Sequence, residues 1–203
     1  MFILTAFLVT ANAFVANSQV RKAFTQRTSS YTPTKKIYNI KGDFTMVGNT
    51  NLTLQSYKVN ENNSNNYMKY VDTDGISTTS NSSSATLAFS AENGALAECT
   101  EIVYAGLYWT GRTSSSVAEL TKRSIKFKGP GQTSYTSLTA SVNDILYPGD
   151  ENMYAAYVEV TNIVKSTKAG EYWIADLATT TGNGGDVGYY GGWGLIVVYQ
   201  NPK

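Results

Sequence analysis

Short runs of apolar, β-branched and aromatic residues recur along the chain from Lys36 onward, separated by clusters of Gly, Asn and Ser. Runs of this length with such boundaries are typical of β-strands. No segment keeps an apolar period of 3.6 residues, so long helices are not expected; only Thr161–Ser166 predicts a helical turn, with Thr161 as its cap. The predicted strands are 37–46, 51–58, 67–72, 85–90, 101–110, 124–128, 133–139, 153–160, 171–179 and 193–200.

Alternation of apolar and polar positions assigns a core face to three of these strands. Glu159 and Asp176 fall on the opposite faces of their strands. The side chains expected in the core are Val103, Ala105, Leu107 and Trp109 in the first, Tyr154, Ala156, Val158 and Val160 in the second, and Trp173, Ala175 and Leu177 in the third.

The last predicted strand does not alternate. Leu195 to Tyr199 is continuously apolar, which is typical of a strand that is covered on both faces and central in its sheet. Its two neighbours must then be earlier strands, or strands of a longer polypeptide; we expect the second. Together the patterns predict an all-β fold, an antiparallel β-sandwich or jelly roll, formed by a single domain over 37–203 that we expect to be truncated at its C-terminus.

The first 36 residues differ from the rest. An apolar run from Phe2 to Val9, followed by small residues, predicts a secretory signal peptide over 1–18, although no Lys or Arg precedes the run. The alternative is a buried N-terminal helix. Residues 19–36 carry five basic side chains and no acidic one, which favours a solvated linker over an arm that touches an acidic surface.

Composition excludes several classes of chemistry. The chain has 203 residues, one Cys and no His, which removes imidazole acid–base catalysis, Ser-His-Asp triads and zinc clusters. A net charge of +1 gives no reason to expect a nucleic-acid partner. The 25 Thr, 19 Ser and 17 Asn suit an extracellular β protein. Cys99 is expected to be a small buried hydrophobe rather than a nucleophile.

Two motifs suggest ligands. Asp72-Thr73-Asp74-Gly75 has the form that opens a calcium loop, with Asp72 and Asp74 as candidate ligands, but position twelve is Ser83 rather than Glu. No other cofactor is expected. A hairpin turn stabilised by the aspartates is the alternative.

The Gly-rich stretch from Gly182 to Trp193 is the second motif. It lacks the Lys of a phosphate-binding loop, so the phosphate interpretation is weak. Its aromatic rings could stack on sugars, or they could simply cap the core beneath a loop of glycines. The candidate ligand-binding residues are Tyr189, Tyr190, Trp193, Asn183 and Asp186.

Two further features carry weaker hypotheses. Glu159 and Asp176 interrupt apolar strands and are candidates for a hydrolytic carboxylate pair, although strand alternation alone explains them. Asn51, Asn62 and Asn81 each begin an N-x-S/T sequon, which matters only in a host that glycosylates such sites.

Three stretches resemble the N-terminal region of very large secreted surface proteins of Bacteroidetes, which are adhesin-like and often gliding-associated. They are 36–44, 103–111 and 190–199, of which the last, Tyr-Gly-Gly-Trp-Gly-Leu-Ile-Val-Val-Tyr, is the most specific. The resemblance implies an extracellular module followed by further β-domains and a type IX secretion sorting domain. It implies no catalytic residues.

These observations predict a non-catalytic, adhesin-type module at the cell surface, secreted and without a transmembrane span in the mature chain. Its partner would be a surface glycan or another surface protein or domain. The alternatives are a dedicated carbohydrate-binding domain and, with less support, a fragment of a glycan-active enzyme.

Overall fold

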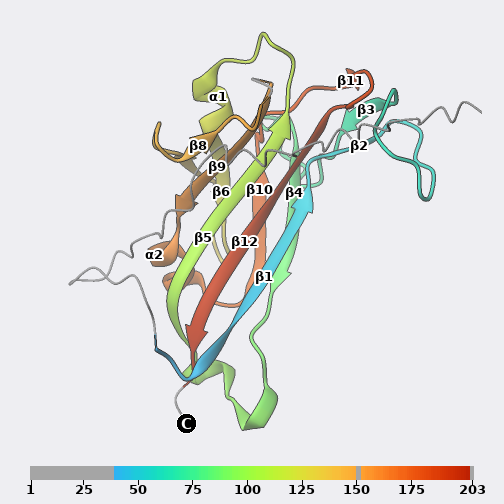
Figure 1. Cartoon of the computed structure of the whole chain (residues 1–203). Coiled ribbons are helices and arrows are strands. Elements are labelled where there is room, and N and C mark those ends of the chain that lie inside the picture. The colour runs from blue at the N-terminus through green and yellow to red at the C-terminus, as the bar shows by residue number, and fades with distance from the viewer. Residues whose placement is uncertain (1–38, 150–151, 202–203) are drawn as a thin grey trace, which may run out of the picture.

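A computed structural model describes residues 39–149 and 152–201. The predicted signal peptide over 1–18 and the basic arm over 19–36 lie outside the described residues. The chain folds as an all-β sandwich, as the sequence predicts, with long antiparallel strands in two facing layers and a small third sheet at one end (Figure 1).

The larger layer is a five-stranded sheet in the order β1-β12-β5-β9-β8, with every neighbouring pair antiparallel. The interior strand β12 pairs with β1 over 192–200 and with β5 over 190–200, the latter through a register shift between Val198 and Tyr199. The strands are β1 (Gly42–Thr50), β5 (Glu101–Arg112), β8 (Ile145–Leu146), β9 (Met153–Glu159) and β12 (Tyr190–Gln200).

The second layer is a four-stranded sheet in the order β4-β10-β6-β7, and a three-stranded sheet in the order β11-β3-β2 extends from the end of the sandwich. The strands of the second layer are β4 (Ser82–Leu87), β6 (Ser124–Lys128), β7 (Thr136–Thr139) and β10 (Gly170–Ala175). Those of the small sheet are β2 (Leu52–Leu54), β3 (Tyr67–Tyr70) and β11 (Gly182–Asn183).

Helical structure in the described residues is limited to short turns, as expected. There are two α-helices, α1 (Glu119–Arg123) and α2 (Thr161–Thr167), and two 3₁₀ turns, η1 (Glu92–Gly94) and η2 (Ala97–Cys99). The predicted turn at Thr161–Ser166 is therefore confirmed, but Thr161 does not cap it. Its hydroxyl accepts the amide hydrogen of Ala105 at 3.0 Å and donates to Glu159 at 2.7 Å, which ties α2 to β5.

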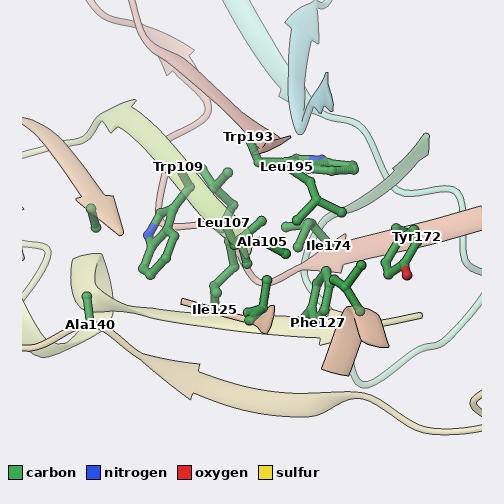
Figure 2. Close-up of a cluster of buried hydrophobic side chains, with 14 of the residues drawn as sticks. Ala105, Leu107, Trp109, Ile125, Phe127, Ala140, Tyr172, Ile174, Trp193 and Leu195 are labelled. Carbon is green, nitrogen blue, oxygen red and sulfur yellow. The ribbon is translucent and has the colours of Figure 1, made fainter. Parts of the chain in front are cut away.

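The core lies between the two layers (Figure 2). Alternate residues of β5 and β12 point into it, among them Leu107, Trp109 and Leu195, and meet Phe127 and Ile174 from the opposite sheet. The indole nitrogen of Trp109 donates to the carbonyl oxygen of Lys122 at 2.9 Å, so its one polar atom is satisfied. The predicted core faces of β5 and β9 are confirmed.

The predicted core face of β10 is wrong in part. Tyr172 and Ile174 are the buried side chains in the strand, whereas Trp173 is half-buried on the outer face, where the Lys128 ammonium lies 5.2 Å from its ring centroid. Leu177 belongs to the core cluster, whereas Ala175, two residues before it, is buried outside that cluster. Asp176 between them adopts a left-handed conformation (φ 55°), which breaks the alternation at the end of the strand.

Two other expectations need correction. Earlier strands, β1 and β5, supply both neighbours of β12, which is second in the sheet rather than central, and only one of its faces is buried in the core: Ile196 and Val198 on the other face remain half-exposed. Cys99 is exposed rather than buried, since it ends a surface 3₁₀ turn just before β5 begins. Short β8 and β11 were not predicted, because two-residue strands leave no periodic pattern.

A buried polar network joins the three sheets. The Asn51 amide nitrogen donates to Asn81 at 2.8 Å, and its side-chain oxygen accepts from Ser83 at 2.7 Å. The Ser83 hydroxyl in turn accepts from the Trp193 indole at 2.9 Å. Asn81 completes the link by pairing with both the amide and the carbonyl of Leu177, each at 3.0 Å. The network fixes where the sheets meet.

Candidate binding surface on the three-stranded sheet

Two polar loops hold the small sheet against the sandwich. Asn63 in the 60–66 loop donates through its amide to the carbonyls of Val187 (3.3 Å) and Tyr189 (3.0 Å). Gly188 has φ +72°, and a Cβ there would collide with the carbonyl oxygen of Asn63, so glycine is required at this contact. The two loops therefore form one rigid unit.

Arg112 supports this unit from β5. Its guanidinium donates to the carbonyl oxygens of Gly184 (2.7 Å) and Gly188 (3.2 Å) and lies 5.5 Å from the centroid of the Tyr189 ring. Tyr189 also packs against the cluster formed by Leu52, Leu54 and Met68. The ring of Tyr189 thus serves mainly to seal the small sheet.

The predicted ligand-binding residues of the Gly-rich stretch make contacts within the fold. Asn183 and Asp186 are exposed, but each bonds Asn65: Asn183 donates to its carbonyl at 3.0 Å and Asp186 accepts from its amide at 2.7 Å. Tyr190 is half-buried at the start of β12. Trp193 is only 6% exposed and belongs to the core, so it cannot serve as a stacking platform.

A different face of the same sheet carries a constellation suited to binding. Met68 points inward on β3, so Tyr67 and Lys69 point outward, and Tyr67 is 62% exposed. Register places Asn183 of β11 opposite Tyr67 and Thr53 of β2 opposite Lys69. The backbone amide of Gln55 donates to the backbone carbonyl of Tyr67 at 2.8 Å. We call this face the Tyr67 surface; its residues are Thr53, Gln55, Tyr67, Lys69 and Asn183.

The Tyr67 surface borders a hollow of about 430 Å³ at the end of the β2–β3 hairpin. Its walls combine one ring, one aliphatic side chain and three uncharged polar side chains. The lining residues are Leu54, Gln55, Ser56, Asn66 and Tyr67. Asn66 is held in place by donating to the carbonyl of Asn62 at 2.8 Å, so one wall is pre-formed. Such a mixture suits a ligand that has both an apolar ring face and hydroxyl groups.

Lys69 is the one charged residue of the Tyr67 surface, while the Glu61 carboxylate, which accepts from Asn66 at 3.1 Å, lies beside the hollow. Lys69 is exposed, and it makes no ion pair with any residue in the described part of the chain. Sequence reasoning missed Tyr67, Gln55 and Lys69, because the run Tyr67-Met68-Lys69-Tyr70 does not alternate between apolar and polar residues and so does not mark an outward face.

The predicted calcium loop is filled by hydrogen-bond donors. The Asp74 carboxylate accepts from the amide of Ile76 (2.8 Å), the hydroxyl of Tyr135 (2.7 Å) and the hydroxyl of Thr79 (3.1 Å). Asp72 accepts from Ser82 at 2.8 Å. Donors in these positions fit the hairpin alternative better than a cation, which needs the same oxygens. Within 39–149 and 152–201, no three His, Cys, Asp or Glu side chains gather as a metal site.

Hydrogen bonding also sets the ionisation of Asp74. Burial alone would raise the pKa of this carboxyl, but the bonds from Ile76, Tyr135 and Thr79 outweigh burial and hold the pKa below its ordinary value of 3.8. Conversely, burial and the bond to Asp74 raise the pKa of the Tyr135 hydroxyl. The pair is therefore a carboxylate bound by a neutral phenol.

Glu159 and Asp176 belong to different sheets and have separate partners. Glu159 accepts from Thr161 beside α2. Asp176 forms an ion pair with Lys126 (2.8 Å) and accepts from the amide and hydroxyl of Ser80. Burial alone would raise the pKa of Asp176, but the bonds from Lys126 and Ser80 outweigh burial and hold the pKa below its ordinary value. Each carboxylate is explained by a structural contact.

The three sequons differ in accessibility. Asn51 and Asn81 are buried in the network that joins the sheets, so neither can accept a glycan in the folded chain. Asn62 is exposed, and its side-chain oxygen accepts the amide hydrogen of Ser64 at 3.0 Å.

Comparison with known proteins adds no relative. No protein family, no curated protein and no solved structure matches this chain. In the described ranges, no helix is both long and apolar enough to cross a bilayer.

Proposed function

We propose that this chain is a non-catalytic, extracellular surface module of the adhesin type that binds a glycan through the Tyr67 surface. The observation that carries the proposal is an exposed ring on the middle strand of a sheet, with polar side chains from both neighbouring strands beside it. A pyranose presents a face of C–H groups that stacks on such a ring, while its hydroxyl groups need amide and hydroxyl partners at the edge.

Rigidity supports a binding role. The loops beneath the surface are held by Asn63, Asn65 and Arg112, so the backbone that carries Tyr67 is supported before a ligand arrives. Pre-formed sites bind more tightly because less conformational entropy is lost on association. Gln55 supplies an exposed amide next to the ring, and it makes no side-chain hydrogen bond with the described residues.

The proposal is tested on an array of neutral and acidic oligosaccharides. The unmodified chain should bind a defined subset, Tyr67→Ala should lose that binding, and Tyr67→Phe should keep most of it because the ring remains. Tyr147→Ala is the matched control, since Tyr147 is an exposed tyrosine beside β8, outside the Tyr67 surface. Binding that survives Tyr67→Ala would refute the assignment of this surface, and no binding to any glycan would refute the ligand class.

A further inference from the structure

The outer face of the five-stranded sheet is apolar and has no covering element among the described residues. Strands β1, β12 and β5 lie side by side at the front of Figure 1. Phe44 and Met46 on the edge strand β1 are 66% and 67% exposed, and register places them beside Val198 and Ile196 of β12. Exposed apolar groups that are contiguous in this way mark an interaction surface.

Next to this apolar ridge lies a shallow trough of glycines. Gly48 and Gly194 face each other across β1 and β12, and Gly192 follows on the same side of β12. At Gly194 the backbone does not need glycine: its φ is not in the left-handed region, and a Cβ would meet only the carbonyl oxygen of Val47, at 3.9 Å. A glycine in a strand interior that neither its backbone conformation nor a close contact within the chain requires is typical of a place where another backbone approaches closely.

The polar groups on this face are already used within the protein. Thr50 donates to the carbonyl of Gly191 and Thr110 to that of Tyr154, both at 2.7 Å, and the hydroxyls of Tyr104 and Tyr108 bond each other at 3.0 Å. A polyhydroxylated ligand would therefore find few free partners here. An apolar protein surface has no hydrogen bonds with water to give up when it binds here, so it fits this face better.

We propose that this face binds the same face of a second copy of the chain, with the Phe44–Met46 ridge of each copy seated in the Gly48–Gly194 trough of the other. Ridge and trough lie on one surface, so a two-fold axis brings each onto its complement. The outward positions from Phe44 to Thr50, and those paired with them on β12 and β5, carry no charge, so two identical faces do not repel each other.

The area sets the strength of the contact. With strands about 4.8 Å apart and a rise of about 3.4 Å per residue, the three strands offer roughly 350–500 Å² per copy. Stable dimers bury about 800 Å² per partner, so the expected dimer is weak and reversible. Weak pairing of this kind is sufficient where many copies share one surface, because tethering raises their effective concentration.

Sedimentation velocity of the purified chain from about 10 µM to about 1 mM tests the proposal, since weak dimers populate over this range. We expect a monomer that converts to a dimer as concentration rises. The double substitution F44S/M46S should abolish the dimer, and G194A should weaken it by filling the trough. V142S, which removes an exposed apolar side chain outside this face, is the control and should leave the dimer intact.

Three results would overturn the proposal. The first is a monomer at every concentration, and the second is a dimer that F44S/M46S and G194A leave unchanged. The third is a monomer in which F44S/M46S instead speeds tryptic cleavage at Lys35 and Lys36, which would assign this face to the chain's own N-terminal segment. Circular dichroism of each variant separates loss of pairing from loss of folding, because the exposed positions contribute little to the core.

Discussion

Gly48 and Gly194 are paired across β1 and β12, yet only one of these two positions has room for a side chain. At Gly48 a Cβ would collide with the carbonyl oxygen of Trp193, a backbone atom that cannot move without disturbing the β1–β12 ladder. At Gly194 a Cβ would make only an ordinary van der Waals contact, 3.9 Å from the carbonyl oxygen of Val47. The first glycine is required by the fold of the single chain, and the second is not.

Alanine at the two positions should therefore have opposite effects on the free energy of unfolding. Gly48→Ala should lower it by about 1–3 kcal/mol through the backbone clash. Gly194→Ala should raise it by about 0.4–1 kcal/mol, because the unfolded chain loses conformational freedom. Urea unfolding at low protein concentration, where the chain is monomeric, measures both. Equal destabilisation by the two substitutions would contradict the contrast.

The buried network predicts a large effect at Asn51. Asn51→Ala removes one hydrogen-bond partner from each of the buried side chains of Asn81 and Ser83 and should lower the free energy of unfolding by about 2–5 kcal/mol. The fluorescence of Trp193, whose indole bonds Ser83, should shift as the network loosens. Asn62→Ala, on the exposed sequon, is the control and should have little effect. A loss below about 1 kcal/mol at Asn51 would show that the network is not cooperative.

Strand patterning predicted most of the fold. Runs of β-branched and aromatic residues located ten of the twelve strands in the described residues, although the boundaries shifted by several residues at β1, β2 and β10. Alternation identified the core faces of β5 and β9, although in β9 Val158 on the core face is only partly buried and Tyr157 on the other face is buried. It failed at β10, because Asp176 adopts a conformation that ends the alternation, and no sequence pattern announces a left-handed aspartate.

The candidate site was harder to predict for a physical reason. Tyr189, Trp193, Asn183 and Asp186 are the conspicuous residues of the Gly-rich stretch, and the fold uses each of them for a core or loop contact. Whether an aromatic ring is exposed depends on which strands pair with its own. Tyr67 faces outward because β2 and β11 flank β3, and the β11–β3 pairing joins segments more than a hundred residues apart.

Asp74 should contribute to the pH dependence of stability. Its pKa is lower in the folded chain than the ordinary 3.8, so folding favours the ionised form. That stabilisation is fully present above the unfolded pKa and is lost as the pH falls through the lower, folded value. Asp74→Asn should therefore be less stable than the unmodified chain at pH 7, and the difference should shrink in acid below about pH 4. Urea unfolding across this range, with Glu98→Gln as a surface control, measures the effect. A difference that stays constant with pH would contradict it.

Calcium should not stabilise the Asp72–Asp74 turn. The donors from Ile76, Thr79 and Tyr135 occupy the oxygens of Asp74 that an ion would need. Melting in the presence of a chelator or of millimolar calcium should therefore give the same Tm. A bound ion whose free concentration is about 100 times its Kd would instead add about 2.7 kcal/mol to the free energy of unfolding. A rise in Tm with calcium that Asp74→Asn removes would establish the site.

Lys69 should set which glycans the Tyr67 surface prefers. Its ammonium group lies two residues from Tyr67 on the same face of β3, and it makes no ion pair with the described residues. A carboxylate or sulfate on a sugar stacked against Tyr67 would then gain an attraction worth about 0.2–1 kcal/mol, typical of exposed charge pairs. Lys69→Gln should weaken binding of acidic oligosaccharides by about 1.5- to 5-fold and leave neutral ones unchanged.

Added salt should reduce the preference of the unmodified chain in the same way, because exposed charges are screened. Lys58→Gln, on the exposed turn after β2, is the matched control. If Lys69→Gln and Lys58→Gln weaken acidic and neutral glycans alike, the contribution is not local to the Tyr67 surface, and the preference must come from the charge of the whole chain.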